Sequence, residues 1–166
     1  MASIEGVVAT RPGWLEQVEV VEVHFDPRRV SYERLVKQAA EAECAVKVFT
    51  RSDAQQLTAS AVVGERAVRA AGEIRTDDDK FYLSRTPLKH VPLTQLQASR
   101  INALVGEHED PTALLVPVQR ALLERIRATP DTGWPVAIGA EFLDAWKRAH
   151  EHAGRKPGSE GAAPVR

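Results

Sequence analysis

The sequence predicts an α+β protein of two layers, a β-sheet with helices packed on it. Its first 64 residues alternate between short β-like runs and helix-like runs in the order β-β-α-β-α, which is typical of a sheet covered by helices. The second half is less regular, and its apolar residues recur mostly at helical spacing. We therefore expect one α+β domain over residues 1–152, with a helical C-terminal part from about residue 94, and a disordered tail over residues 153–166.

Two neighbouring strands are expected near the N-terminus. Over Val18–Phe25, apolar residues alternate with Glu22 and His24 at a period of two, which is typical of a strand with one buried face. Val7–Thr10 is a shorter run of β-like residues. Because Arg11–Trp14 contains both proline and glycine, it predicts a turn between the two runs.

Two helices and a third strand are expected next. Ser31 is a suitable N-cap for a helix that ends near Glu43. Ala45–Thr50 has valines at alternate positions and predicts a strand. Ser52 begins a capping-box pattern, which predicts a helix that ends near Gly64.

The second half predicts an extended arm and further helices. Prolines interrupt Phe81–Leu93, which favours an extended arm over a helix. Thr94 begins another capping-box pattern, and an apolar stripe at helical spacing follows it. Asp110-Pro111 suits a helix start, and Pro117 is expected to divide that helix. A last amphipathic helix is expected from residue 142 to about residue 152.

Composition and charge limit the classes of partner. The 22 Lys and Arg residues nearly balance the 23 Asp and Glu residues, so the formal net charge is -1. This balance gives no electrostatic reason to expect nucleic acid or an anionic membrane as a partner. The sequence shows neither a signal-peptide pattern nor an apolar run near the ~20 residues that span a bilayer, and its five histidines show no metal-ligand spacing. We expect a cytoplasmic protein without a metal site.

One contiguous pattern resembles a known family. "EGVVATRPGW" is followed closely by "EVVEVHFDPRRVSYERLVK", and the two span residues 5–37. This pattern resembles the central segment of the peptide-methionine (S)-S-oxide reductases, in which a Thr-Arg-x-Gly turn leads into an EVVEV strand and a Ser-Tyr-Glu helix. "VFTRSDAQQ" more weakly resembles the family's next strand and helix start. The resemblance implies a ferredoxin-like sheet, and it says little about residues 80–166.

The family's nucleophile has no counterpart in this sequence. In the family, a cysteine of a GCFW motif precedes the matching segment, and N-H-D-P and Q-Y-R motifs bind the sulfoxide oxygen; none of these motifs is present here. One interpretation is that the chain starts late and that an upstream start codon would restore a first strand.

A related group of proteins gives a closer motif match. These thioredoxin-like proteins, some of them selenoproteins, carry a VPG-selenocysteine-x-x-T motif, which "IEGVVAT" at Ile4–Thr10 resembles with Val7 at the selenium position. Valine can be neither deprotonated nor reversibly oxidised. This departure argues against selenium-type chemistry at Val7.

Cys44 is the only thiol, so any thiol chemistry of this chain has to use it. It falls between an expected helix and an expected strand, at the end of the sheet where the resemblance places active sites. Glu41 and Glu43 argue against reactivity, because nearby negative charge raises the pKa of a thiol. The alternative is a small buried residue at a helix end, which is the commoner role of a free cysteine.

The arm supplies further candidates for contacts with a substrate or partner. Tyr82, Arg85 and His90 are suited to bind an anion or a thiol partner if the arm crosses the open end of the sheet. Trp14, in the motif region, is a further candidate. The alternative is an arm that Phe81 and its neighbours anchor against the core.

Two functions follow as hypotheses. The first is a thiol-dependent redox protein resembling the methionine sulfoxide reductases and thioredoxin-like proteins, in which Cys44 attacks the oxidised sulfur of a protein or small molecule. An external thioredoxin-like thiol would then reduce the intermediate, and no cofactor is expected. The second is a catalytically inactive binding or structural module on the same scaffold.

Overall fold

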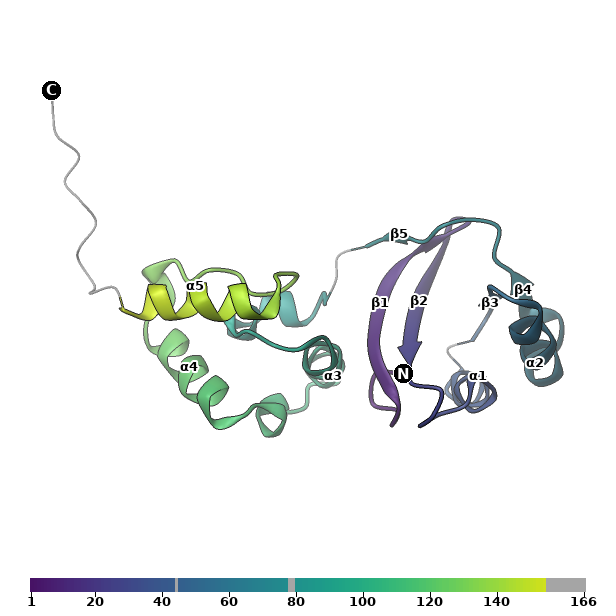
Figure 1. The fold of residues 1–166 in the computed structure, drawn as a ribbon, viewed down its shortest axis with the longest axis horizontal. Coiled ribbons are helices and arrows are strands. Elements are labelled where there is room, and N and C mark those ends of the chain that lie inside the picture. The colour runs from purple at the N-terminus through teal and green to yellow at the C-terminus, as the bar shows by residue number, and fades with distance from the viewer. Residues whose placement is uncertain (44, 78–79, 155–166) are drawn as a thin grey trace, which may run out of the picture. The chain divides into compact units, whose positions relative to one another are not determined.

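The protein has the predicted α+β class and is divided into two compact units. The computed structural model describes residues 1–43, 45–77 and 80–154 (Figure 1). The first unit, Met1–Lys80, contains the strands, and the second unit, which starts at Phe81, is helical. We expected the helical part to begin at about residue 94. In the structure the helical unit begins earlier, at Phe81. No described helix is both long and apolar enough to cross a membrane.

The first unit starts with a β-hairpin formed by β1 (Val7–Leu15) and β2 (Val18–Phe25). The strands pair antiparallel, with a register shift between Val7 and Ala9. Glu16 and Gln17 form the turn, and both have positive φ values, 51° and 67°. This is the conformation that a two-residue type I′ hairpin turn requires.

The prediction of a turn in the "RPGW" segment is wrong, because the segment lies inside β1. Pro12 is opposite Val21, at a position where β1 exchanges no hydrogen bond with β2, so the missing N–H of proline costs nothing there. Gly13 pairs with the short strand β5 (Arg75–Thr76). A Cβ atom at Gly13 would lie 2.8 Å from the carbonyl oxygen of Arg75. The glycine therefore permits close strand packing.

The rest of the first unit alternates helices and strands. α1 (Tyr32–Glu41) is capped by Ser31, as predicted, and α2 (Asp53–Val63) ends at Gly64, also as predicted. β3 (Val48–Thr50) is shorter than the strand expected from Ala45 and pairs in parallel with β4 (Ala67–Arg69). The described strands form two sheets, with the orders β2-β1-β5 and β3-β4.

α1 packs against two separate apolar clusters. Val36 of α1 belongs to a cluster formed mainly with α2, and Leu35 belongs to a second cluster beneath the hairpin. The first cluster contains Val36, Ala59, Val63 and Ala67, and the second contains Val7, Val30 and Leu35. α1 therefore links the part of the unit that carries β1 and β2 to the part that carries β3 and β4.

The second unit contains α3 (Gln95–Gly106), α4 (Pro117–Ala128) and α5 (Phe142–Gly154). The capping box predicted at Thr94 is confirmed, because Thr94 and Gln97 each accept a hydrogen bond from the other's backbone N–H. The proline that begins α4 separates it from a preceding 3₁₀ turn, as predicted. The tail expected over residues 153–166 lies mostly outside the described residues.

The prediction of an extended arm over residues 81–93 is wrong. The segment forms two 3₁₀ helices, Leu83–Arg85 and Pro87–His90. Its prolines fail to keep it extended because Pro87 is the first residue of the second 3₁₀ helix, a position that needs no N–H donor. The segment is part of the core of this unit, which contains Leu83, Leu88, Val91, Ile101, Leu115, Leu122, Leu123, Ile126, Trp134 and Ala149.

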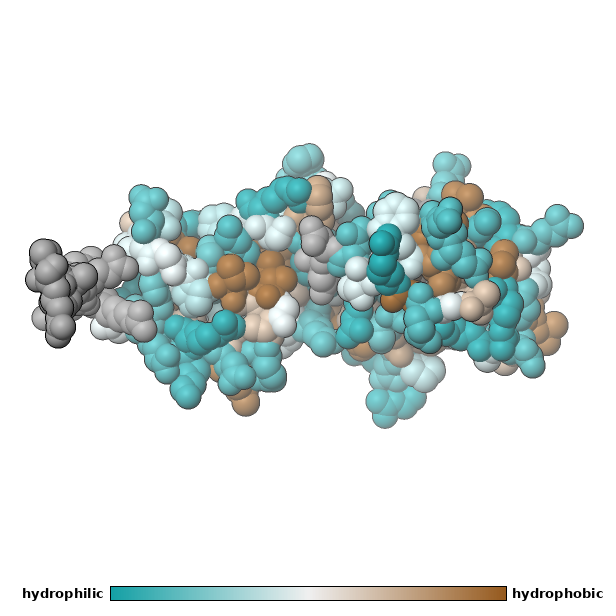
Figure 2. Space-filling model, turned by 90° about the horizontal axis from the view of Figure 1, so that it is seen from above, coloured by the Kyte–Doolittle hydropathy of each residue, from teal (hydrophilic) through white to brown (hydrophobic). Residues whose placement is uncertain are grey.

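Apolar side chains also reach the surface. Figure 2 shows brown, apolar patches among the hydrophilic residues on the face that it displays. In the first unit, the large exposed apolar residues are Val8, Val21, Val46 and Leu57. Val21 lies in β2, a terminal strand of the first sheet, and Val46 lies two residues before β3.

Candidate functional site

Cys44 lies outside the described residues, so its neighbours along the chain define the candidate site. α1 ends at Glu41, and Glu43 has a φ value of 54°, in the left-handed region. Both glutamates are exposed, as the sequence suggests. Ala45, on the other side, is only 4% exposed. The chain thus passes from an exposed acidic helix end to a buried position within four residues.

A positive charge is held beside this stretch of backbone. The Arg66 guanidinium donates hydrogen bonds from Nη1 to the carbonyl oxygen of Ala45, at 3.0 Å, and from Nε to that of Val63, at 3.3 Å. These two bonds fix the cation on the residue that follows Cys44. A fixed cation close to a thiol favours its thiolate form and opposes the effect of nearby carboxylates.

Sequence reasoning did not find Arg66. The contact joins residues 21 positions apart, and an arginine after a helix-ending glycine has no pattern of its own. Only the pairing of β3 with β4 brings the end of α2 next to the residues after α1.

Val7 is a packing residue of the first unit. Its side chain is 2% exposed and packs with Val30 and Leu35. The preceding Gly6 has a φ value of 94°, and a Cβ atom there would lie 2.6 Å from Cγ1 of Val30. The side chain at the selenocysteine-like motif position is therefore enclosed by the core.

Trp14 has a polar partner within the first unit. Its indole Nε1 donates a hydrogen bond of 2.9 Å to Oδ2 of Asp77, and the pair is exposed to solvent. This bond links β1 to the residue after β5. Trp14 therefore helps to hold the short strand β5 against β1.

Tyr82 and Arg85 come together in the second unit, through Phe81. The Arg85 guanidinium lies 3.3 Å from the centre of the Phe81 ring and donates a 2.9 Å hydrogen bond to the Phe81 carbonyl oxygen. The Tyr82 ring meets Phe81 edge to face at 5.3 Å. It also covers Gly106, where a Cβ atom would lie 2.8 Å from the ring. Their contacts are those of a surface aromatic cluster with one cation.

His90 contacts a different part of the second unit. Its Nδ1 is 3.1 Å from the carbonyl oxygen of Pro135, so Nδ1 carries the proton and donates it. Burial lowers the pKa of His90, and the hydrogen bond to Pro135 only partly opposes this effect. The described contacts of His90 fit a neutral histidine that ties the second 3₁₀ helix to the loop before α5.

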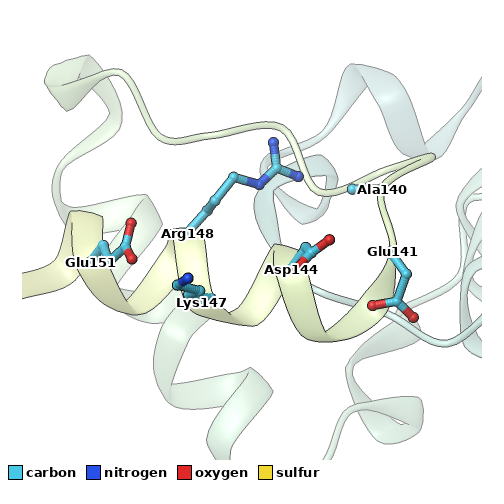
Figure 3. A pocket seen from close by; sticks show the side chains of 6 residues that line it. All are labelled: Ala140, Glu141, Asp144, Lys147, Arg148 and Glu151. Carbon is cyan, nitrogen blue, oxygen red and sulfur yellow. The ribbon is translucent and has the colours of Figure 1, made fainter.

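A shallow depression lies along α5 and the residues just before it (Figure 3). Arg148 extends from it towards the preceding loop, where it is 3.4 Å from the Val136 carbonyl oxygen. Three carboxylates and two cations line it, and none of the residues proposed from the sequence does. Its lining consists of Ala140, Glu141, Asp144, Lys147, Arg148 and Glu151.

Metal binding has no support among the residues that the structure describes, since no group of three or more His, Cys, Asp or Glu is placed to hold an ion.

Comparison with known proteins adds no family: no family model matches the chain, and no curated protein matches it significantly.

Proposed function

We propose that this chain is a thiol-dependent redox protein that uses Cys44, as its resemblance to the methionine sulfoxide reductases and thioredoxin-like proteins suggests. The observation that supports this proposal is the Arg66 guanidinium, held on the carbonyl oxygen of Ala45. A cation fixed on the backbone of the residue that follows the only cysteine of the chain favours the thiolate, which is the nucleophilic form.

The proposed reaction reduces an oxidised sulfur. The Cys44 thiolate attacks the sulfur of a sulfoxide, and after proton uptake the oxygen is transferred to Cys44 as a sulfenic acid, leaving a thioether. An external thioredoxin-like dithiol then attacks the sulfenic sulfur and releases water, which leaves a mixed disulfide. Its second thiol displaces Cys44, so that the donor ends as a disulfide and Cys44 as a thiol. Cytoplasmic thiol donors would suit this cycle.

The pH dependence of Cys44 alkylation in the native protein, followed by mass spectrometry, tests the proposal. We expect the rate to level off below about pH 7, against ~8.5 for an ordinary thiol. Arg66→Gln should move this midpoint upward, because it removes the cation. Arg69→Gln is the matched control, because Arg69 is a nearby arginine that pairs with Asp53 instead. Labelling that requires denaturation, or equal midpoints in both variants, contradicts the proposal.

A second function, an inactive binding or structural module, is favoured by the burial of Val7. On this alternative, the motif position has become part of the core, and Cys44 only packs. Cys44→Ser separates the two: a methionine sulfoxide reduction assay with thioredoxin as donor should lose all activity in this variant if the first proposal holds. Activity that is unchanged in Cys44→Ser contradicts the first proposal, and activity of neither chain above the protein-free background supports the second.

A further inference from the structure

The two sheets of the first unit have four outer strand edges without a neighbour in the part of the chain that the structure describes, and those of β2 and β3 are two of them. β2 is the terminal strand of the order β2-β1-β5, and β3 pairs only with β4. The chain passes from β2 through α1 to β3, and in the view of Figure 1 β3 lies between β2 and β4. An unpaired strand edge offers a row of backbone donors and acceptors to an added strand.

The register shows which groups β2 offers. In an antiparallel pair, alternate residues exchange hydrogen bonds with the neighbouring strand. The two-residue turn makes Leu15 and Val18 a bonded pair, and Pro12, which has no N–H, is opposite Val21 as an unbonded one. The backbone N–H and C=O groups of Glu19, Val21 and Val23 consequently point away from β1. They form the open edge.

α1 lies against both sides of the region between β2 and β3. Tyr32 stacks on Phe25 of β2, with ring centres 6.5 Å apart, and also packs against the cluster that contains Val36. Its hydroxyl is buried and has no hydrogen-bond partner among the described residues. Buried polar atoms are rarely left without a partner in complete structures. The hydroxyl of Tyr32, whose ring stacks on Phe25 at the end of β2, therefore still needs a hydrogen-bond partner.

β3 is short, and it pairs with one neighbouring strand, β4. A strand was expected from Ala45, but only the three residues that pair with β4 adopt it. Val46 is 78% exposed and Val21 on β2 is 56% exposed. Valine favours strands because its side chain packs on neighbouring strands, and neither valine has such a cover here.

We propose that the first unit binds an extended segment of a partner protein as an added strand between β2 and β3, which joins the two sheets. Antiparallel pairing with β2 places the segment's residues opposite Phe25, Val23 and Val21 on the face where Phe25 and Val23 pack against the cluster that contains Leu35 of α1. These residues are apolar, and the one opposite exposed Glu19 is basic. Threonine at the intervening positions points to the opposite face and favours the strand conformation.

The first experiment adds a synthetic peptide to the full chain and follows amide hydrogen exchange residue by residue. The peptide alternates Val and Thr, ends in Lys and is about seven residues long, within the usual length of a strand. We expect exchange at Glu19, Val21 and Val23 to slow by about tenfold or more, and exchange at Val20 and Glu22 to stay unchanged because these amides already bond to β1. A scrambled peptide without the alternation is the control.

Two blocking changes locate the contact. Val21→Pro removes an N–H that points away from β1 and should weaken peptide binding by about tenfold, the upper effect of one hydrogen bond. Val21→Thr is the matched variant, because it keeps the N–H and the β-branched shape, and it should bind nearly as well. Methylation of the peptide nitrogens opposite Glu19, Val21 and Val23 tests the same bonds with the unaltered protein, so the test stands even if Val21→Pro does not fold.

Three results would overturn the proposal. The first is no slowing of exchange at β2 with millimolar peptide, and the second is equal binding of the N-methylated peptide. The third is a free protein that sediments as a dimer with Glu19, Val21 and Val23 already protected, since a second copy would then occupy the edge. All these readouts are independent of the Cys44 thiol, so they succeed or fail separately from the redox proposal.

Discussion

At the scale of single residues, backbone conformation and close approach account for several identities that composition leaves unexplained. Gly6 combines a φ value of 94° with the close approach of Val30. A positive φ disfavours any residue with a Cβ atom, and the neighbouring valine also occupies the space that this atom would need. Gly6 therefore allows Val7 to enter the core directly after a tight backbone bend.

Gly6→Ala should destabilise the protein by about 1–3 kcal/mol, because it adds backbone strain and a steric clash with Val30. Urea unfolding followed by circular dichroism measures this change. Gly72→Ala is the matched control, since nothing lies within 4 Å of a Cβ atom at that position, and it should leave stability unchanged or slightly raised. Equal effects of the two substitutions would show that Val30 can move aside at no cost.

At the scale of elements, local signals located the helices well and the turns poorly. Ser31, Thr94 and Gly64 predicted helix ends that the structure confirms, because a cap depends on residues within one turn. The hairpin turn was missed because Glu16 and Gln17 are not typical turn residues, whereas Pro12 and Gly13 are. Whether Pro and Gly make a turn depends on which strand lies beside them, and a sequence pattern does not contain that information.

The hairpin turn offers a stabilising substitution. Gln17→Gly should raise the free energy of unfolding by up to about 1 kcal/mol, because it removes the left-handed strain of a side chain, partly offset by the greater freedom of glycine in the unfolded state. Glu16→Gly should gain less, because the Glu16 carboxylate accepts a 2.9 Å hydrogen bond from the Ala71 N–H. Thermal unfolding of both variants checks the order, and a larger gain at residue 16 contradicts it.

At the scale of the whole molecule, the sequence predicted the class but not the division into two units. The change from strands to helices was visible along the chain, but the "FYLSRTPLKHVPL" segment looked like an arm. Burial of Leu83 and Leu88 in the helical core places it in the second unit instead. The candidate site was predictable only as far as Cys44 itself, since Arg66 reaches Ala45 through strand pairing. The sequence predicted the strand of β3 but not that one of its edges would lack a neighbour among the described strands.

Because each unit has its own apolar clusters, a core defect in one unit should weaken that unit alone. Ile101 is fully buried in the second unit, and Ile101→Ala should cost about 2–5 kcal/mol through the lost contacts and the cavity. Native-state hydrogen exchange should then show reduced protection in α3, α4 and α5 and unchanged protection in β1 and β2. Leu143→Ala is the control, because Leu143 is 72% exposed and its loss should change stability by less than about 0.5 kcal/mol. If the Ile101 variant loses protection equally in both units, the chain unfolds as one cooperative body, and the added strand proposed for the first unit would then also stabilise the second.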